Sequence, residues 1–347
     1  MDSIIELGLN SLKEQNATSS TVFSIVSILL NLFVLMEKDA NNSGIHVIRQ
    51  AIAPNSTKEQ LEKLLKDLVE VSVNGETHLF KHRLHIGNDV SLNQILIDKV
   101  LEKLKINLET VRYTQENLGQ LYNLLARNPT SFGNLNQRKS SSDRVEILES
   151  TASFSPIWKS CKDFTMVEKR LDFYTSPEKK ISQIFAHTET TQFKFNYDEY
   201  FEVVSIPIQS STPLSFVIFL PDRRFGLADA IDKMTPSSFE DLMKGLHFKK
   251  LRISIPIFNT IKQLDVTSIL NGNSHVSKVI HTSDIKLRLR EAYGERQDCK
   301  TEHPSATFGL YRPADHKIPY RFRADHPFMY AIMREKIPLA FGIYSAS

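Results

Sequence analysis

The spacing of hydrophobic residues divides the chain into a helical first third and a strand-rich remainder. In residues 57–71, Leu61, Leu64 and Leu68 recur at helical spacing, and Ser56 with Glu59 three residues later matches a helix-capping pair. The same period predicts helices over 21–36, 43–53, 90–105 and 115–127. We therefore expect the first third to be built mainly of packed helices.

After about residue 145 the apolar residues alternate with polar ones, which is typical of strands. Strands are predicted there over 145–154, 192–197, 201–208, 214–220, 251–258, 285–290 and 331–343, with short helices over 226–234 and 237–246; one earlier strand is predicted over 78–88. Helices first and antiparallel-type strands later indicate the α+β class, because alternating βαβ units would mix the two along the chain.

Composition adds limits on class and compartment. The 347 residues suggest about two domains, and the net charge of +3 gives no concentrated basic character, so nucleic acid is not an expected partner. The longest uncharged apolar stretch, 21–36, is too short to span a membrane and lies too late for a usual secretory signal.

Only Cys161 and Cys299 are present, so no disulfide framework is expected. An intracellular, cytoplasmic location is favoured, with an extracellular one as the alternative.

Catalytic signatures are missing from the sequence. It contains no glycine-rich phosphate loop, no H-E-x-x-H and no G-x-S-x-G, so we predict no enzyme, no cofactor and no metal. His78, His82 and His85 are interpreted as surface histidines. Two further groups are interpreted as solvated strand faces rather than polyanion sites: Lys249, Lys250 and Arg252, and Arg288 with Arg290.

Several separated segments resemble the serpin family, in family order from about residue 20 to the end. The most specific is 322–332 (FRADHPFMYAI); the others are 23–28, 154–158, 219–227, 252–258 and 276–281. The resemblance implies a single serpin domain over 1–347, in which helices pack on three mostly antiparallel sheets. It also implies an exposed reactive-centre loop at about 292–320, so the two-domain estimate from length is replaced by one domain. A monomer is expected.

The resemblance assigns structural roles near the centre of the main sheet. Ser24, Ser27 and His281 would hydrogen-bond in the shutter, where the central strands part, and Ser150 stands where the family has asparagine. Trp158 would be the buried tryptophan at the top of the same sheet. Without the resemblance, these residues are ordinary helix-start serines, a strand-edge histidine and a core tryptophan.

The family mechanism is suicide inhibition: a peptidase cleaves and acylates the loop, and the loop then inserts as an extra strand in the main sheet. Insertion requires small, uncharged side chains at alternate hinge positions. With Gly294 as the hinge glycine, the inward set is Glu295, Gln297, Cys299 and Thr301. In the opposite strand phase, it is Gly294, Arg296, Asp298 and Lys300. Both phases bury charge, which favours a non-inhibitory serpin acting as a substrate or binding protein.

The alternative is a functional inhibitor of a chymotrypsin-like peptidase. Counting forward from Gly294 places the scissile bond at Phe308-Gly309, whereas counting back from Phe322 gives Arg312-Pro313. The implied partner is a serine or cysteine peptidase that engages the loop. A heparin site is not expected, because the lysines of 57–71 are interleaved with acidic residues.

Overall fold

The computed structural model describes eleven parts of the chain. They are residues 2–29, 31, 63, 80–87, 107–111, 147–155, 167–188, 191–208, 213–265, 278–287 and 319–346. Their strands form two hydrogen-bonded sheets, and three helices have defined bounds: α1 (Asp2–Lys13), α7 (Leu227–Lys233) and α8 (Pro236–Lys244). Among these residues, no helix is long and apolar enough to cross a membrane.

The smaller sheet has five strands in the order β11-β12-β4-β2-β3. Its strands are β2 (Phe80–Gly87), β3 (Asn107–Val111), β4 (Ile147–Phe154), β11 (Asn259–Asp265) and β12 (Lys278–Lys286). The central pair, β12 with β4, is parallel, and so is β2 with β3. β11 and β2 flank the central pair in antiparallel fashion.

The larger sheet has ten strands, nine of them in the order β1-β15-β14-β9-β8-β7-β10-β6-β5, while β13 pairs with β10. Its strands are β1 (Thr21–Ser24), β5 (Val167–Ser176), β6 (Lys179–His187), β7 (Thr191–Tyr197), β8 (Phe201–Pro207), β9 (Leu214–Pro221), β10 (His247–Pro256), β13 (Tyr320–Arg323), β14 (Phe328–Arg334) and β15 (Ile337–Tyr344). The first half of β10 pairs with β7 and its end with β6, so β10 joins two parts of the sheet. The resemblance implied three sheets; because of this junction, the described strands form two hydrogen-bonded networks.

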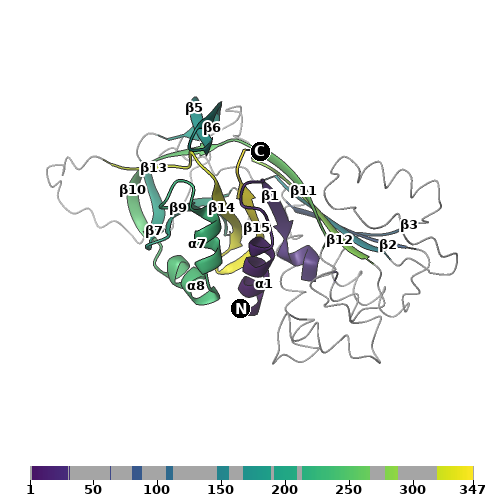
Figure 1. Cartoon of the computed structure of the whole chain (residues 1–347). Helices are drawn as coiled ribbons and strands as arrows, with labels where there is room; N and C mark the ends of the chain where they lie inside the picture. Colours follow the sequence, from purple (N-terminus) through teal and green to yellow (C-terminus); the bar gives the residue numbers. More distant parts are fainter. Residues whose placement is uncertain are drawn as a thin grey trace, which may run out of the picture.

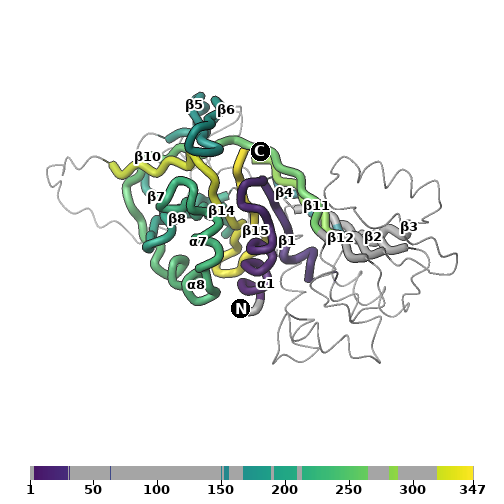
Figure 2. Tube along the Cα trace, in the orientation of Figure 1, coloured from purple at the N-terminus to yellow at the C-terminus, as the bar shows by residue number. Residues whose placement is uncertain are grey.

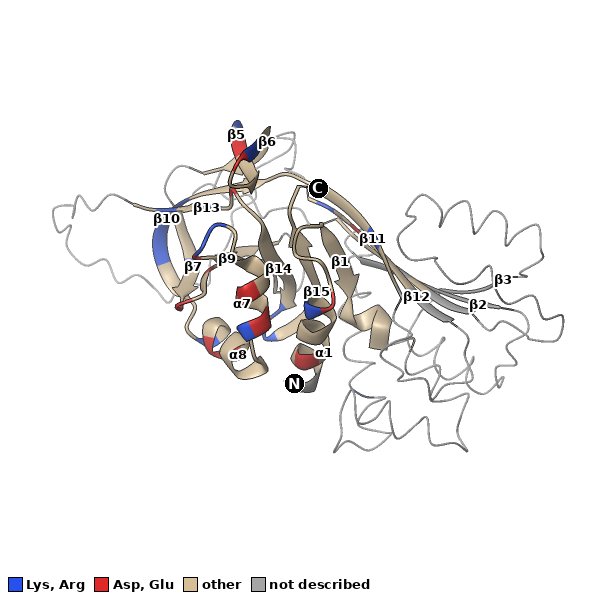
Figure 3. Cartoon of the chain, viewed as in Figure 1, with Lys and Arg blue, Asp and Glu red and all other residues tan. Residues whose placement is uncertain are grey.

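The two ends of the chain meet in the larger sheet. The N-terminal strand β1 pairs antiparallel with the C-terminal strand β15, with Phe23 opposite Phe341, and Figure 2 shows the purple and yellow tubes side by side. Helices α1, α7 and α8 lie together beside this part of the sheet (Figure 1). Charged residues lie along α7 and α8, whereas the neighbouring strands β14 and β15 are largely uncharged (Figure 3). The helices therefore present their apolar side to the sheet and their charges to water.

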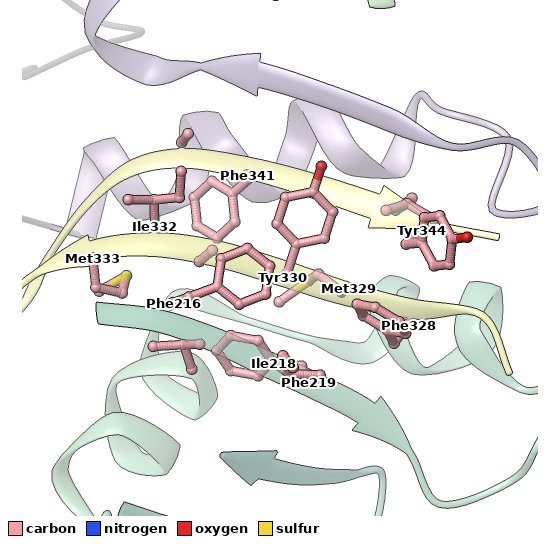
Figure 4. Packing of buried hydrophobic residues seen from close by; sticks show 14 of the residues in the cluster. Phe216, Ile218, Phe219, Phe328, Met329, Tyr330, Ile332, Met333, Phe341 and Tyr344 are labelled. Atoms are coloured by element: carbon pink, nitrogen blue, oxygen red, sulfur yellow. The ribbon is translucent and has the colours of Figure 1, made fainter. Parts of the chain in front are cut away.

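Aromatic packing joins these layers into one core. Phe219 of β9 stacks on Phe239 of α8 at 5.2 Å between ring centroids, and Phe239 contacts Phe341 of β15 edge-on at 5.7 Å. Phe216 stacks on Tyr330 at 5.2 Å, as seen close by in Figure 4. All five rings are less than 2% exposed, and large aromatic side chains contribute heavily to core stability.

Gly342 permits the close approach of β1, β14 and β15. A Cβ at this position would overlap the Tyr330 ring and lie 2.5 Å from the Thr21 carbonyl oxygen. The Tyr330 hydroxyl donates to that same carbonyl at 3.1 Å, which links β14 to β1. Full burial raises the pKa of the Tyr330 hydroxyl, so it remains a neutral donor. Glycine is required here for space rather than for turn geometry.

The structure confirms most of the predicted strands and both short helices, and it changes several boundaries. The helix predicted over 21–36 is wrong at its start, because Thr21–Ser24 is strand β1 and helix begins at residue 25. The strand predicted over 331–343 is two strands, β14 and β15, separated by a turn in which Glu335 has a φ of 52°. Strands β3, β5, β6, β11 and β13 were not predicted. The helices predicted over 43–53, 90–105 and 115–127 lie outside the described residues, and so does 57–71 apart from Lys63.

Candidate functional site

Strands β4 and β12 form the central junction of the smaller sheet, here called the seam. They pair in parallel over eight positions, from Lys278 opposite Ile147 to Ile285 opposite Phe154. The strands hydrogen-bond directly to each other along this length, so no strand lies between them. In Figure 1, β12 runs with β11 and β2 as one extended sheet.

The side chains on the inner face of the seam are almost completely shielded from solvent. Ser150, Ala152 and Phe154 of β4 are each no more than 2% exposed, and so are the β12 residues opposite the first and last of them, His281 and Ile285. The side chains between them, such as Ser153 and Asp284, are only half-buried. This alternation is the two-residue period of a strand with one buried face.

His281 is the centre of a buried hydrogen-bond network on the inner face. The backbone N–H of Ser24 donates to His281 Nε2 at 2.9 Å, and Ser150 Oγ lies 2.8 Å from Nδ1. A backbone N–H can only donate, so Nε2 is an acceptor and the ring is neutral with its proton on Nδ1. The ring therefore donates to Ser150 and also accepts from Ser283 Oγ, which lies 2.5 Å from Nε2.

The start of the second helical segment is fixed to this network. Ser24 Oγ accepts from the backbone N–H of Ser27 at 3.2 Å, as an N-terminal cap does. Asn31 lies one turn beyond Ser27, and its Nδ2 donates to Ser150 Oγ at 2.8 Å. The network therefore connects three elements: β1 with the following helix, β4 and β12.

The structure brings four of the sequence-predicted site residues together. Ser24, Ser150 and His281 are bonded directly, and Ser27 is joined to them through Ser24. Asn31 and Ser283 belong to the same network and were not predicted as site residues. The remaining predicted positions lie outside the described residues: Trp158, Gly294, Glu295, Gln297, Cys299, Phe308, Gly309, Arg312 and Pro313. Their assignments, like the loop bounds and the single-domain assignment, stay predictions.

A second bond crosses the seam on its outer face. Ser153 Oγ donates to Asp284 Oδ2 at 3.0 Å, and the two residues are opposite each other in register. Hydrogen bonds to a carboxylate are stronger than neutral ones. β4 and β12 are therefore held together by side chains on both faces, through Ser150–His281 inside and Ser153–Asp284 outside.

Asp284→Ala should weaken the seam without disturbing the inner network. We expect the free energy of unfolding to fall by about 1 kcal/mol, because one half-buried, charge-assisted bond is lost. Amide hydrogen exchange should accelerate in 278–285 and 147–154. Lys286→Ala is the matched control, since Lys286 is also a half-buried residue on the outer side of β12. Equal effects of the two substitutions would show that Asp284 has no special part in holding the strands.

Comparison with known proteins identifies the class. A family model described as Serpin (serine protease inhibitor) matches residues 7–345. The chain therefore belongs to the serpin family. This family is generally associated with inhibition of serine proteases. Among the described residues, no group of His, Cys, Asp and Glu side chains could hold a metal ion.

Sequence relatives include proteins of viruses and of a plant. Serine proteinase inhibitor 2 of Cowpox virus is 24% identical over 303 residues, which cover 81% of this chain and 85% of that protein. Serine proteinase inhibitor 2 of Rabbitpox virus is 22% identical over 326 residues, covering 87% and 90%. Serpin-ZX of Arabidopsis thaliana is 23% identical over 209 residues, covering 54% and 53%.

Solved serpin structures share the fold. A tumour-suppressing serpin superposes with a TM-score of 0.72 at 18% identity, covering 100% of this chain and 98% of that one. Native protease nexin-1, solved with heparin, gives 0.72 at 14% identity and covers 100% and 97%. At such low identity the likeness shows the fold alone.

Proposed function

We propose that this serpin does not trap peptidases by loop insertion and acts instead as a loop substrate or as a binding protein. The observation that carries the proposal is the dry inner face of the seam, where Ser150, Phe154, His281 and Ile285 are each no more than 2% exposed. An inserted strand would have to add alternate side chains to this same face.

The sequence after β12 does not supply suitable side chains. In one strand phase the first inward residue after Gly294 is Glu295, and in the other Arg296, Asp298 and Lys300 point inward. A charge buried without a partner costs several kcal/mol per group. The neighbours it would meet are apolar, or are hydroxyl and imidazole groups already bonded to one another. Insertion is therefore opposed in either phase.

Cleavage experiments test the proposal. The protein is incubated with chymotrypsin-, elastase- and trypsin-like peptidases, and complexes that resist denaturant are sought by electrophoresis. We expect turnover of the loop, no covalent complex, and a melting temperature that stays within about 2 °C after cleavage, because no new strand is buried. N-terminal sequencing of the released fragment would distinguish Phe308-Gly309 from Arg312-Pro313.

A stable complex together with a large gain in melting temperature would overturn the proposal. It would support the alternative, an inhibitor of a chymotrypsin-like peptidase cleaved near Phe308. A serine peptidase remains the partner class that the family typically engages, whichever outcome is found.

We also propose a cytoplasmic location, supported by the use of only two cysteines in 347 residues. Cell fractionation of the tagged full chain tests it. Recovery of the protein from the medium, rather than from the cytosolic fraction, would contradict this location.

A further inference from the structure

One face of strands β7, β10 and β13 gathers basic side chains from three distant parts of the sequence. Lys194 lies opposite Phe248 in the β7–β10 register, and Arg252 lies opposite Arg321 in the β10–β13 register. Paired residues project from the same face of a sheet, and alternate residues of one strand share a face. The basic strand face is therefore defined as Gln192, Lys194, Phe248, Lys250, Arg252 and Arg321.

This face is open to solvent, whereas much of the opposite face packs against the core. Lys194, Lys250 and Arg321 are exposed, and the Phe248 side chain is 55% exposed. On the opposite face of the same strands, Phe193, Leu251 and Phe322 are no more than 3% exposed, whereas Lys249 is half-buried and Tyr320 is 38% exposed. None of the described residues that define the face is acidic. Figure 3 shows the blue stretch along β10.

We propose that the basic strand face binds an extended acidic segment of a partner protein. Alternate residues of a strand are about 6.6–6.8 Å apart, so Phe248, Lys250 and Arg252 present side chains at that interval along β10. An extended peptide has the same interval between alternate side chains, so its carboxylates match the spacing of the cations. Carboxylates pair with lysine and arginine by charge-assisted hydrogen bonds, and strand-like peptides are commonly recognised through alternate side chains.

The aromatic residue favours a peptide over single-stranded nucleic acid. Bases bind such surfaces by stacking on exposed rings. The only aromatic residue of the basic strand face is Phe248, and the Lys194 ammonium already lies over its ring, 5.8 Å from the centroid. A stacking base would have to displace that lysine. A carboxylate can instead bind the lysine where it is held, while an apolar side chain of the peptide packs against the exposed part of the ring.

The basic strand face belongs to the larger sheet, whereas the seam belongs to the smaller one. Binding at this face does not require loop cleavage or insertion. A negative binding result would therefore leave the proposed function standing, and a trapping serpin could still have this surface.

Fluorescence anisotropy tests the proposal with the full chain. The probe is a fluorescein-labelled peptide of alternating glutamate and threonine, and we expect saturable binding that weakens as salt is added. Lys250→Glu with Arg321→Glu should weaken binding by about tenfold or more, because attraction becomes repulsion at two adjacent strands. The control is Lys169→Glu with Arg170→Glu, two exposed residues of β5 that give the same change in net charge, and its affinity should stay within about twofold.

Melting temperatures of both double variants establish that they fold. If the variant with Lys250→Glu and Arg321→Glu melts at a lower temperature than the wild type, Lys250→Gln with Arg321→Gln replaces it. The peptide affinity of this second variant is expected to fall by about threefold or more. Unchanged peptide affinity in the folded variant would overturn the proposal. Tighter binding of an oligothymidylate or a heparin fragment of matched charge than of the peptide would also overturn it, because the surface would then serve another class of polyanion.

Discussion

Replacing His281 with alanine is expected to lower the free energy of unfolding by about 3–5 kcal/mol. The imidazole is fully buried and serves three partners: the Ser24 backbone N–H, Ser150 Oγ and Ser283 Oγ. Truncation leaves the N–H and at least one hydroxyl without a partner and opens a cavity at the seam. Equilibrium unfolding in urea measures the loss, and hydrogen exchange should report faster opening of β4 and β12.

His247→Ala is the matched control for this prediction. His247 is exposed and its ring hydrogen-bonds to the Gly245 carbonyl, so its removal should change stability by no more than about 0.5 kcal/mol. His281→Asn should recover part of the loss, since an amide can both donate and accept. A loss below about 1 kcal/mol for His281→Ala would mean that the network does not hold the seam together.

The sequence indicated the class of fold well because the apolar pattern of the core strands is strong. It was least informative where a distant partner decides the local structure. Thr21–Ser24 belongs to a largely apolar, uncharged run that suits helix or strand equally. It is a strand because it pairs with residues 340–343, which lie more than 300 positions away in the chain. Strand β5 escaped prediction for a different reason: Phe173 is its only fully buried residue, so no apolar alternation is visible.

The same limits apply to the site. Ser24, Ser27, Ser150 and His281 were found through the family resemblance, since none of them has a catalytic motif. Ser283 lies two positions from His281 and therefore on the same face of β12, but the predicted strand began only at residue 285. Asn31 was not singled out from the sequence, although helical spacing from Ser27 places it on the face that contacts Ser150.

The seam and the hinge sequence together explain why a serpin fold need not imply trapping. Loop insertion requires that β4 and β12 separate, which breaks Ser153–Asp284 outside and Ser150–His281 inside. In a trapping serpin, the energy released by a well-matched inserted strand would offset this cost. Under the proposed function, the charged residues of the predicted hinge would remove that gain, so the closed five-strand sheet is expected to remain the stable state even after the loop is cut.

Replacing the predicted hinge residues with small, uncharged ones should allow the cleaved loop to insert. Two variants show which of the two strand phases applies. The first carries Glu295→Thr, Gln297→Ala and Cys299→Ala, and the second carries Arg296→Ala, Asp298→Ala and Lys300→Ala. Only the variant that removes charge from the inward positions should gain stability on cleavage, because its inserted strand no longer buries an unpaired charge. The gain in melting temperature should be about 10 °C or more, since several kcal/mol of new strand pairing and burial are involved.

The control for the hinge exchange removes two charges from the other end of the predicted loop, through Asp315→Ala and Lys317→Ala. This variant should behave as the wild type does, with loop turnover and no gain in melting temperature after cleavage by a chymotrypsin-like peptidase. If neither hinge variant gains stability, hinge charge is not what prevents insertion, and the bonds across the seam become the dominant barrier. That outcome would be tested by combining each hinge variant with Asp284→Ala, in which the outer bond between β4 and β12 is already absent.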